Sequence, residues 1–194
     1  MAKFILPGER DSGDRYLVCC GGKDAILIAA VDGIGHGEEA AEAANAAISV
    51  LKSGVEEPVI SVVRRCHEAL RSKRGVVLSL ASIDTERGMM TWIGVGNVHG
   101  VLMRAGAQRG GAQETLLLRG GVVGSQLPPL QATVLPVAKN DTLVFATDGV
   151  RTEFVDDLSP LETPQRTADK VLKHHCRGND DALVLVVRLI GVRA

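Results

Sequence analysis

The sequence predicts an α+β fold in which two antiparallel sheets pack face to face and helices cover the outside. Two features of the chain favour it: strand-like apolar segments follow one another, and helical segments also follow one another, instead of the two kinds alternating. No repeat, low-complexity tract or linker divides the chain. Because 194 residues with 45% hydrophobic content can bury one substantial core, we expect a single domain over residues 1–194.

The N-terminal half predicts two strands followed by two helices. Residues 16–20 and 25–31 are apolar and flank Gly21-Gly22-Lys23-Asp24, which is typical of a hairpin turn and therefore predicts antiparallel pairing. Alanine and aliphatic residues then recur at helical spacing over residues 38–52. A proline suited to a first helical turn opens a second helix over residues 58–72.

The C-terminal half predicts a series of strands, one helix and a closing strand. Residues 106–113 have the composition of a mobile loop, and residues 120–129 form a longer connection. A helix is expected over residues 163–176, and the nearly continuous apolar run at 182–190 is typical of a central strand covered on both faces. The other expected strands cover residues 75–83, 89–95, 98–104, 114–118 and 142–147.

Composition excludes several classes of function. The 22 basic and 23 acidic residues nearly balance, and aromatic residues make up only 3%, so we expect no nucleic-acid partner. No apolar stretch is long enough to cross a bilayer, so we expect no membrane association. The four cysteines have no CxxC spacing, and Cys19 and Cys20 are adjacent, which favours a reducing, cytoplasmic location.

The main chemical signal is a repeated strand ending. Two apolar strands each run directly into an Asp-Gly pair, Asp32-Gly33 and Asp148-Gly149. An Asp-Gly pair is common in hairpin turns, and that interpretation stays open for either one alone. However, the first pair is followed by further glycines and a helix, and the second by polar, helix-like sequence, so neither leads into a returning strand. Carboxylates that converge at strand ends repel unless a hard cation such as Mg²⁺ or Mn²⁺ neutralises them.

Two further acidic segments precede strands. Asp14 comes directly before the first strand, and Asp180 and Asp181 come directly before the last one. Each could be ordinary turn chemistry, but four acidic strand boundaries without zinc-type histidine and cysteine spacing favour one shared cation site. The adjacent His174 and His175 point in different directions on a helix, so we do not expect them to bind a metal together.

These residues together resemble the PPM-type metal-dependent protein phosphatases, and most closely their bacterial SpoIIE/RsbX-like group. The resemblance covers essentially the whole chain in order. It depends on four motifs, which are Asp14, Val31-Asp32-Gly33-Ile34-Gly35-His36-Gly37, Ala146-Thr147-Asp148-Gly149 and Asp180-Asp181. The segment Gly94-Val95-Gly96-Asn97 adds modest support.

The resemblance implies an αββα sandwich that holds two Mn²⁺ or Mg²⁺ ions and hydrolyses phosphoserine or phosphothreonine without a phosphoenzyme. It implies that Asp32 bridges both ions and that the Gly33 carbonyl binds one of them. Asp148 and Asp180 would hold one ion, and Asp14 would anchor the other side. Asp32 and Asp148 would thus be the catalytic carboxylates.

The motifs do not assign the general acid or the phosphate-binding arginine to a single residue. His36 is a candidate general acid, because its ordinary pKa suits neutral pH, although a turn histidine is the competing interpretation. The arginine-led acidic pair of larger eukaryotic relatives is absent, so Arg10, Arg15 and Arg151 are only candidates for phosphate binding.

The implied substrates are phosphorylated STAS-domain proteins of the anti-anti-sigma type, which would make the chain a bare, monomeric catalytic module that resets stress signalling. Two alternatives stay open: a non-catalytic module that binds a STAS partner, and a metal-dependent hydrolase of small phosphate esters. Assays of a phosphoprotein and of small esters, with and without Mn²⁺, would separate them.

Overall fold

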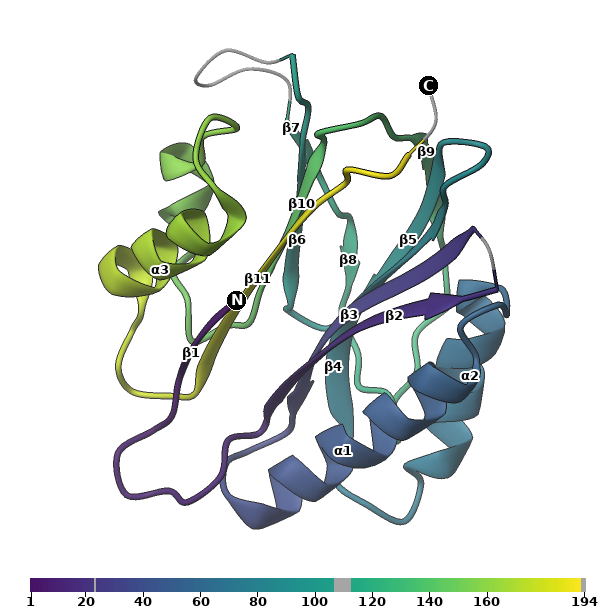
Figure 1. Cartoon of the computed structure of the whole chain (residues 1–194). Helices are drawn as coiled ribbons and strands as arrows, with labels where there is room; N and C mark the ends of the chain where they lie inside the picture. The colour runs from purple at the N-terminus through teal and green to yellow at the C-terminus, as the bar shows by residue number, and fades with distance from the viewer. Residues whose placement is uncertain (23, 107–112, 193–194) are drawn as a thin grey trace.

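The computed structural model describes residues 1–22, 24–106 and 113–192, and it confirms the α+β prediction. Two sheets pack against each other between two helical layers, which gives the αββα order (Figure 1). Helices α1 (Glu38–Ser53) and α2 (Val59–Ala69) cover one sheet. Helix α3 (Pro164–His175) and the short 3₁₀ helix η1 (Thr152–Asp157) cover the other.

The sheet next to α1 and α2, called the β3 sheet below, has the strand order β2-β3-β4-β5-β8, with β9 also paired to β5. Its neighbours are antiparallel except for a two-residue parallel pairing between β5 and β8. Its strands are β2 (Asp14–Gly21), β3 (Ala25–Gly33), β4 (Val76–Asp84), β5 (Met89–Val95), β8 (Leu118–Arg119) and β9 (Thr133–Pro136).

The second sheet, called the β10 sheet, has the order β1-β11-β10-β6-β7 and is antiparallel throughout its described pairs. The last strand lies inside this sheet, between β1 and β10, as its continuous apolar run predicted. The strands are β1 (Ala2–Phe4), β6 (His99–Met103), β7 (Gln113–Thr115), β10 (Thr142–Ala146) and β11 (Ala182–Arg188).

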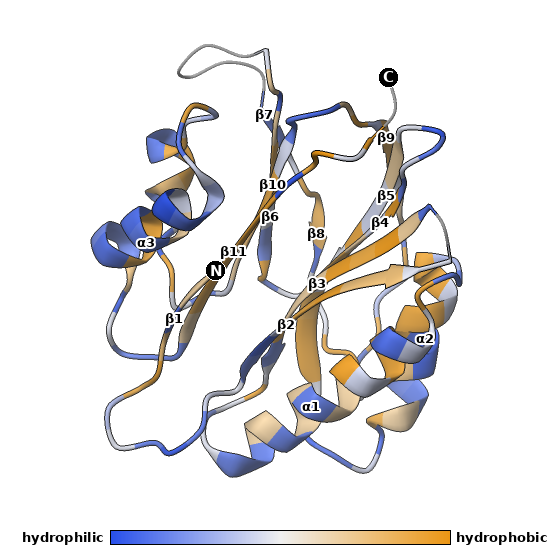
Figure 2. Ribbon diagram, in the orientation of Figure 1, coloured by the Kyte–Doolittle hydropathy of each residue, from blue (hydrophilic) through white to orange (hydrophobic). Residues whose placement is uncertain are grey.

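Three apolar layers hold the sandwich together, and Figure 2 shows hydrophobic residues gathered along its strands. On β3, Leu27 and Ala29 pack toward the α1–α2 pair, while Ile28 and Ala30 belong to the core between the sheets. Phe145 of β10 is fully buried in the same inter-sheet core. A third cluster joins the β10 sheet to α3 and η1. Strands covered on both faces therefore have apolar side chains at consecutive positions.

Some elements differ from the sequence prediction. The expected strand at 114–118 is two short strands, β7 and β8, in different sheets. Strand β1 is too short to show a period, and β9 is mostly exposed and ends in proline, so neither had a clear pattern. Most of the loop expected at 106–113 lies outside the described residues. No helix in the described part of the chain is both long and apolar enough to span a membrane.

Candidate metal centre

Both Asp-Gly pairs lie where the backbone of one element closely approaches another. A Cβ atom on Gly33 would lie 2.2 Å from the carbonyl oxygen of Ala40 in α1. A Cβ on Gly149 would lie 1.9 Å from the carbonyl oxygen of Asp181. Neither pair forms a hairpin turn, because the first leads to α1 and the second to η1, so that interpretation is wrong. Glycine is required here for close packing, and this packing sets the positions of the adjacent aspartates.

Three of the predicted aspartates line one cavity of about 420 Å³. Asp32 reaches it from the end of β3, Asp148 from the residues after β10, and Asp180 from the segment before β11. None of the described lining residues is basic, and none is a histidine or a cysteine. The rest of the lining consists of glycine, aliphatic and amide residues: Ile34, Gly35, Val77, Gly96, Asn97, Gly120, Gly121 and Val122.

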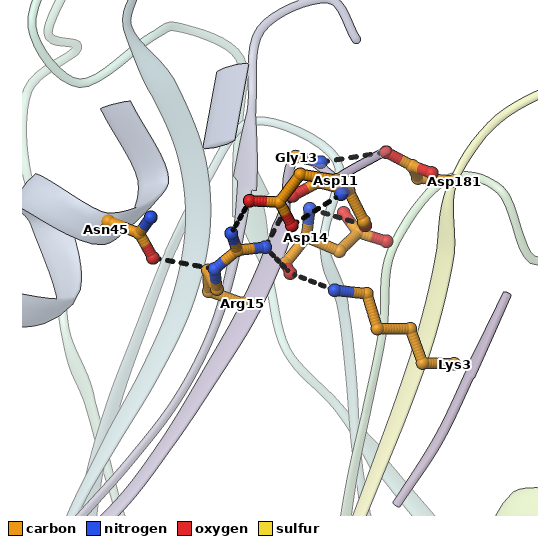
Figure 3. Close-up of polar contacts among 8 residues, drawn as sticks. Lys3, Asp11, Gly13, Asp14, Arg15, Asn45 and Asp181 are labelled. Atoms are coloured by element: carbon orange, nitrogen blue, oxygen red, sulfur yellow. Dashed lines mark hydrogen bonds and ion pairs between the residues drawn. The ribbon is translucent and has the colours of Figure 1, made fainter. Parts of the chain in front are cut away.

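Asp14 lies beside Asp32 but does not line this cavity. The two residues are directly paired across β2 and β3, and Asp14 is only 1% exposed. The hydroxyl of Thr147 donates a 2.8 Å hydrogen bond to Oδ2 of Asp14 and accepts one of 2.8 Å from the Leu183 backbone N–H. Lys3 donates to the Asp14 carbonyl oxygen at 3.0 Å (Figure 3). Asp14 is therefore an anchored carboxylate next to the cavity.

The two adjacent aspartates before β11 have different environments. Asp181 is 5% exposed, and its carboxylate accepts hydrogen bonds from the backbone N–H groups of Leu6 at 2.9 Å and Gly13 at 2.8 Å. Figure 3 shows the contact with Gly13, which ties the segment before Asp14 to the start of β11. Asp180 instead lines the cavity. Only Asp180 of this pair is thus directed to the candidate metal centre.

The carboxylates concentrate negative charge in a partly desolvated place. Burial first, and then the neighbouring aspartates, raise the pKa of Asp32 from 3.8 to about 9. Burial also raises the pKa of Asp14 to about 7; the Thr147 hydrogen bond and Lys3 oppose this shift, and Asp181 adds to it. The pKa of Asp180 is raised as well, mainly by burial. This crowding favours a cation, which would lower the energy of the charged carboxylates.

The donor chemistry fits a hard divalent cation. Aspartates from three separate segments of the chain share one cavity, and Mg²⁺ and Mn²⁺ prefer oxygen ligands. Within the described residues, no group of three or more acidic, histidine or cysteine side chains is arranged so that it could hold a metal ion. The fit therefore depends on the kind of donors and on their shared cavity.

The candidate general acid and phosphate-binding arginines do not line the cavity. His36 is exposed, and its Nδ1 atom lies 2.7 Å from Oε1 of Glu9. Arg15 is bound to Asp11 and to Asn45, as Figure 3 shows. Arg151 donates to the carbonyl oxygen of His174. Arg10 lines a different cavity, beside Glu9 and Asp11.

One residue of the site had no role in the sequence analysis. The side-chain amide of Asn97, in the turn between β5 and β6, donates a 2.8 Å hydrogen bond to Oδ2 of Asp148. The Gly94–Asn97 motif marked this turn, but its partner lies 51 positions away and cannot be found from spacing alone. His99 is near Asp148 too, and burial lowers its pKa.

Comparisons with known proteins agree with this architecture. Phosphoserine phosphatase RsbX of Bacillus subtilis (strain 168) is 32% identical over 95 residues, which cover 49% of this chain and 47% of RsbX. The alignment thus spans about half the length of this curated relative. A solved chain from work on the bacterial stressosome, described as a modular system adapted to control secondary messenger signalling, is 27% identical with a TM-score of 0.85, and 96% of each chain is covered.

A crystal structure of RsbX in complex with magnesium has a TM-score of 0.83 at 21% identity, covering 95% of this chain and 91% of that one. The fold is therefore that of the PP2C-type phosphatase domains. Within this class, residues 22–190 match the family described as Stage II sporulation protein E (SpoIIE). The chain belongs to the SpoIIE family.

Proposed function

We propose that this protein is a metal-dependent phosphatase that removes phosphate from serine or threonine side chains of other proteins. The observation that carries the proposal is the convergence of Asp32, Asp148 and Asp180 on one cavity in a member of the SpoIIE family. Asp14 is anchored immediately beside them. The sequence similarity to RsbX, a phosphoserine phosphatase, supports the choice of reaction.

In this proposal Asp32 would be a ligand of two divalent ions, Mn²⁺ or Mg²⁺, and the Gly33 carbonyl would be a ligand of one of them. Asp148 and Asp180 would hold one ion, and Asp14, which is paired with Asp32, would anchor the other side. The ions supply Lewis acidity and charge neutralisation for the phosphate ester. The crystal structure of RsbX with magnesium supports metal dependence in this fold.

The protein itself contributes position and charge. Strand pairing fixes Asp14 opposite Asp32, and the close contact at Gly149 fixes Asp148 relative to the start of β11. Because no described lining residue is basic, the phosphate dianion finds no side-chain cation in the cavity. We therefore assign its neutralisation to the ions, and leave His36, which lies outside the cavity lining, as a candidate proton donor.

We propose that the substrates are phosphorylated STAS-domain regulators of stress signalling and that the protein acts in the cytoplasm. The similarity to RsbX and to a chain from the bacterial stressosome supports the signalling role. The four cysteines are free, as in proteins of a reducing compartment.

The test compares a serine-phosphorylated STAS-domain protein with p-nitrophenyl phosphate, each in excess EDTA and then with added Mn²⁺ or Mg²⁺. We expect phosphoprotein turnover only with metal, and we expect Asp148→Asn to abolish it while the protein stays folded. Turnover that persists in EDTA would overturn the metal dependence. Hydrolysis of the small ester alone would favour the small-ester hydrolase, and binding of the phosphoprotein without turnover would favour the non-catalytic module.

A further inference from the structure

The hydrogen bond between Asn97 and Asp148 differs from the other contacts of the aspartate cluster. Asp14 is held by a hydroxyl, and Asp181 by two backbone N–H groups, and both are buried. Asp148 is only partly buried. Among the hydrogen bonds of the described residues, the 2.8 Å bond from Nδ2 of Asn97 is the only one that reaches its carboxylate.

The turn that carries Asn97 is itself tightly fixed. Gly96 has a φ of +94°, and a Cβ on it would lie 2.2 Å from a methyl carbon of Val77. Its backbone N–H donates to the Arg119 carbonyl at 2.8 Å. On the other side of Asn97, the carbonyl of Val98 accepts a hydrogen bond from the buried Ser79 hydroxyl. The turn is thus attached to its neighbours on both sides of Asn97, although the Asn97 side chain is exposed.

The chemistry of an amide suits this position. A lysine or arginine would hold the carboxylate but would also cancel the charge that a divalent cation needs. An aspartate would add negative charge to a crowded cluster and could not donate when ionised. The amide donates a hydrogen bond to Oδ2 and leaves both the negative charge and Oδ1 available.

We propose that Asn97 is a positioning residue that holds the Asp148 carboxylate in the orientation that binds the divalent ion. The inference rests on the proposed function, because it needs the metal at Asp148. Residues that orient a metal ligand in this way typically change metal affinity by about 10–100-fold when they are removed.

The experiment measures Mn²⁺ affinity directly, by calorimetric titration of the metal-free protein with no substrate present. We expect Asn97→Ala to raise the Kd for Mn²⁺ by about tenfold or more. Because the side chain is exposed, the variant should keep its Tm in EDTA. The matched control is Gln165→Ala on the outer helix α3. It also removes a side-chain amide that donates to an aspartate, since Nε2 of Gln165 lies 2.8 Å from Oδ1 of Asp169. The control should leave the Kd unchanged.

Turnover gives a second readout. With Asn97→Ala, the Mn²⁺ concentration for half-maximal activity should rise by the same factor, while kcat at saturating Mn²⁺ stays within about threefold of wild type, because Asp148 is still present. Asn97→Leu, which keeps the branched shape without the donor, should behave in the same way. If the wild-type protein binds Mn²⁺ and the Kd of both variants stays within about twofold of the wild-type value, the inference is wrong and the proposed function stands. If the wild-type protein binds no Mn²⁺, both are overturned.

Discussion

Replacing Asp32 by asparagine should stabilise the metal-free protein while it removes a proposed metal ligand. The substitution keeps the size of the side chain, so the packing of β3 should barely change. It removes a charge that burial and four neighbouring aspartates disfavour. Activity and metal-free stability should therefore move in opposite directions.

The magnitude follows from the pKa of Asp32, which rises from 3.8 to about 9 on folding. For a carboxyl with a raised folded pKa, the penalty is absent below the unfolded pKa, grows as pH rises between the two values, and is complete above the folded value. Because pH 7 lies roughly 3 units above the unfolded pKa, the penalty to the free energy of folding at this pH is at most about 4 kcal/mol. Because Asp14 titrates in the same range and shares the repulsion, we expect a gain of about 2–4 kcal/mol.

Thermal unfolding in EDTA at pH 7 measures this gain. For a chain of this length, about 2–4 kcal/mol corresponds to a rise in Tm of roughly 5–15 °C. The rise should shrink as the pH is lowered toward 3.8, the unfolded pKa, below which the wild-type carboxyl is protonated in both states. The control is Asp156→Asn, which neutralises an exposed aspartate in η1 and should change Tm little. An unchanged or lower Tm for Asp32→Asn in EDTA would show that the cluster does not store this repulsion.

Three further substitutions test other parts of the structure. Gly149→Ala places a methyl group 1.9 Å from the Asp181 carbonyl oxygen, so we expect the free energy of unfolding to fall by about 1–3 kcal/mol and Mn²⁺ binding to weaken. A wild-type Tm with normal Mn²⁺ binding would contradict the close approach. Thr147→Val keeps the shape but removes the hydroxyl that donates to Asp14, which should cost about 1–3 kcal/mol in urea unfolding, and a neutral result would remove its anchoring role. Cys66→Ser should leave kcat unchanged, because burial raises the pKa of this thiol to about 12 and keeps it unreactive, and should lower stability by about 1–2 kcal/mol, because the residue is fully buried. Lost turnover in the folded variant would refute a purely packing role.

Much of the fold could be predicted from local patterns. The helix over 38–52 and the strand over 89–95 agree closely with α1 and β5, because each has a clear period or a buried apolar run. The grouping of strands and helices then predicted two sheets with outer helices. Strands β1 and β9 were missed because pairing with β11 and β5, rather than local sequence, makes them strands.

The sequence by itself determined the chemical composition of the candidate metal centre: acidic residues at strand boundaries, with Asp-Gly at two of them. Only the tertiary structure decided which of these residues share a cavity. It placed Asp180 in the cavity lining and gave Asp181 two backbone N–H partners, although the two are adjacent in the chain. It also brought Asn97 to Asp148. The reason is that these relations depend on how separate strands pack and pair, and a local pattern specifies the face and the end of a strand but not its neighbour.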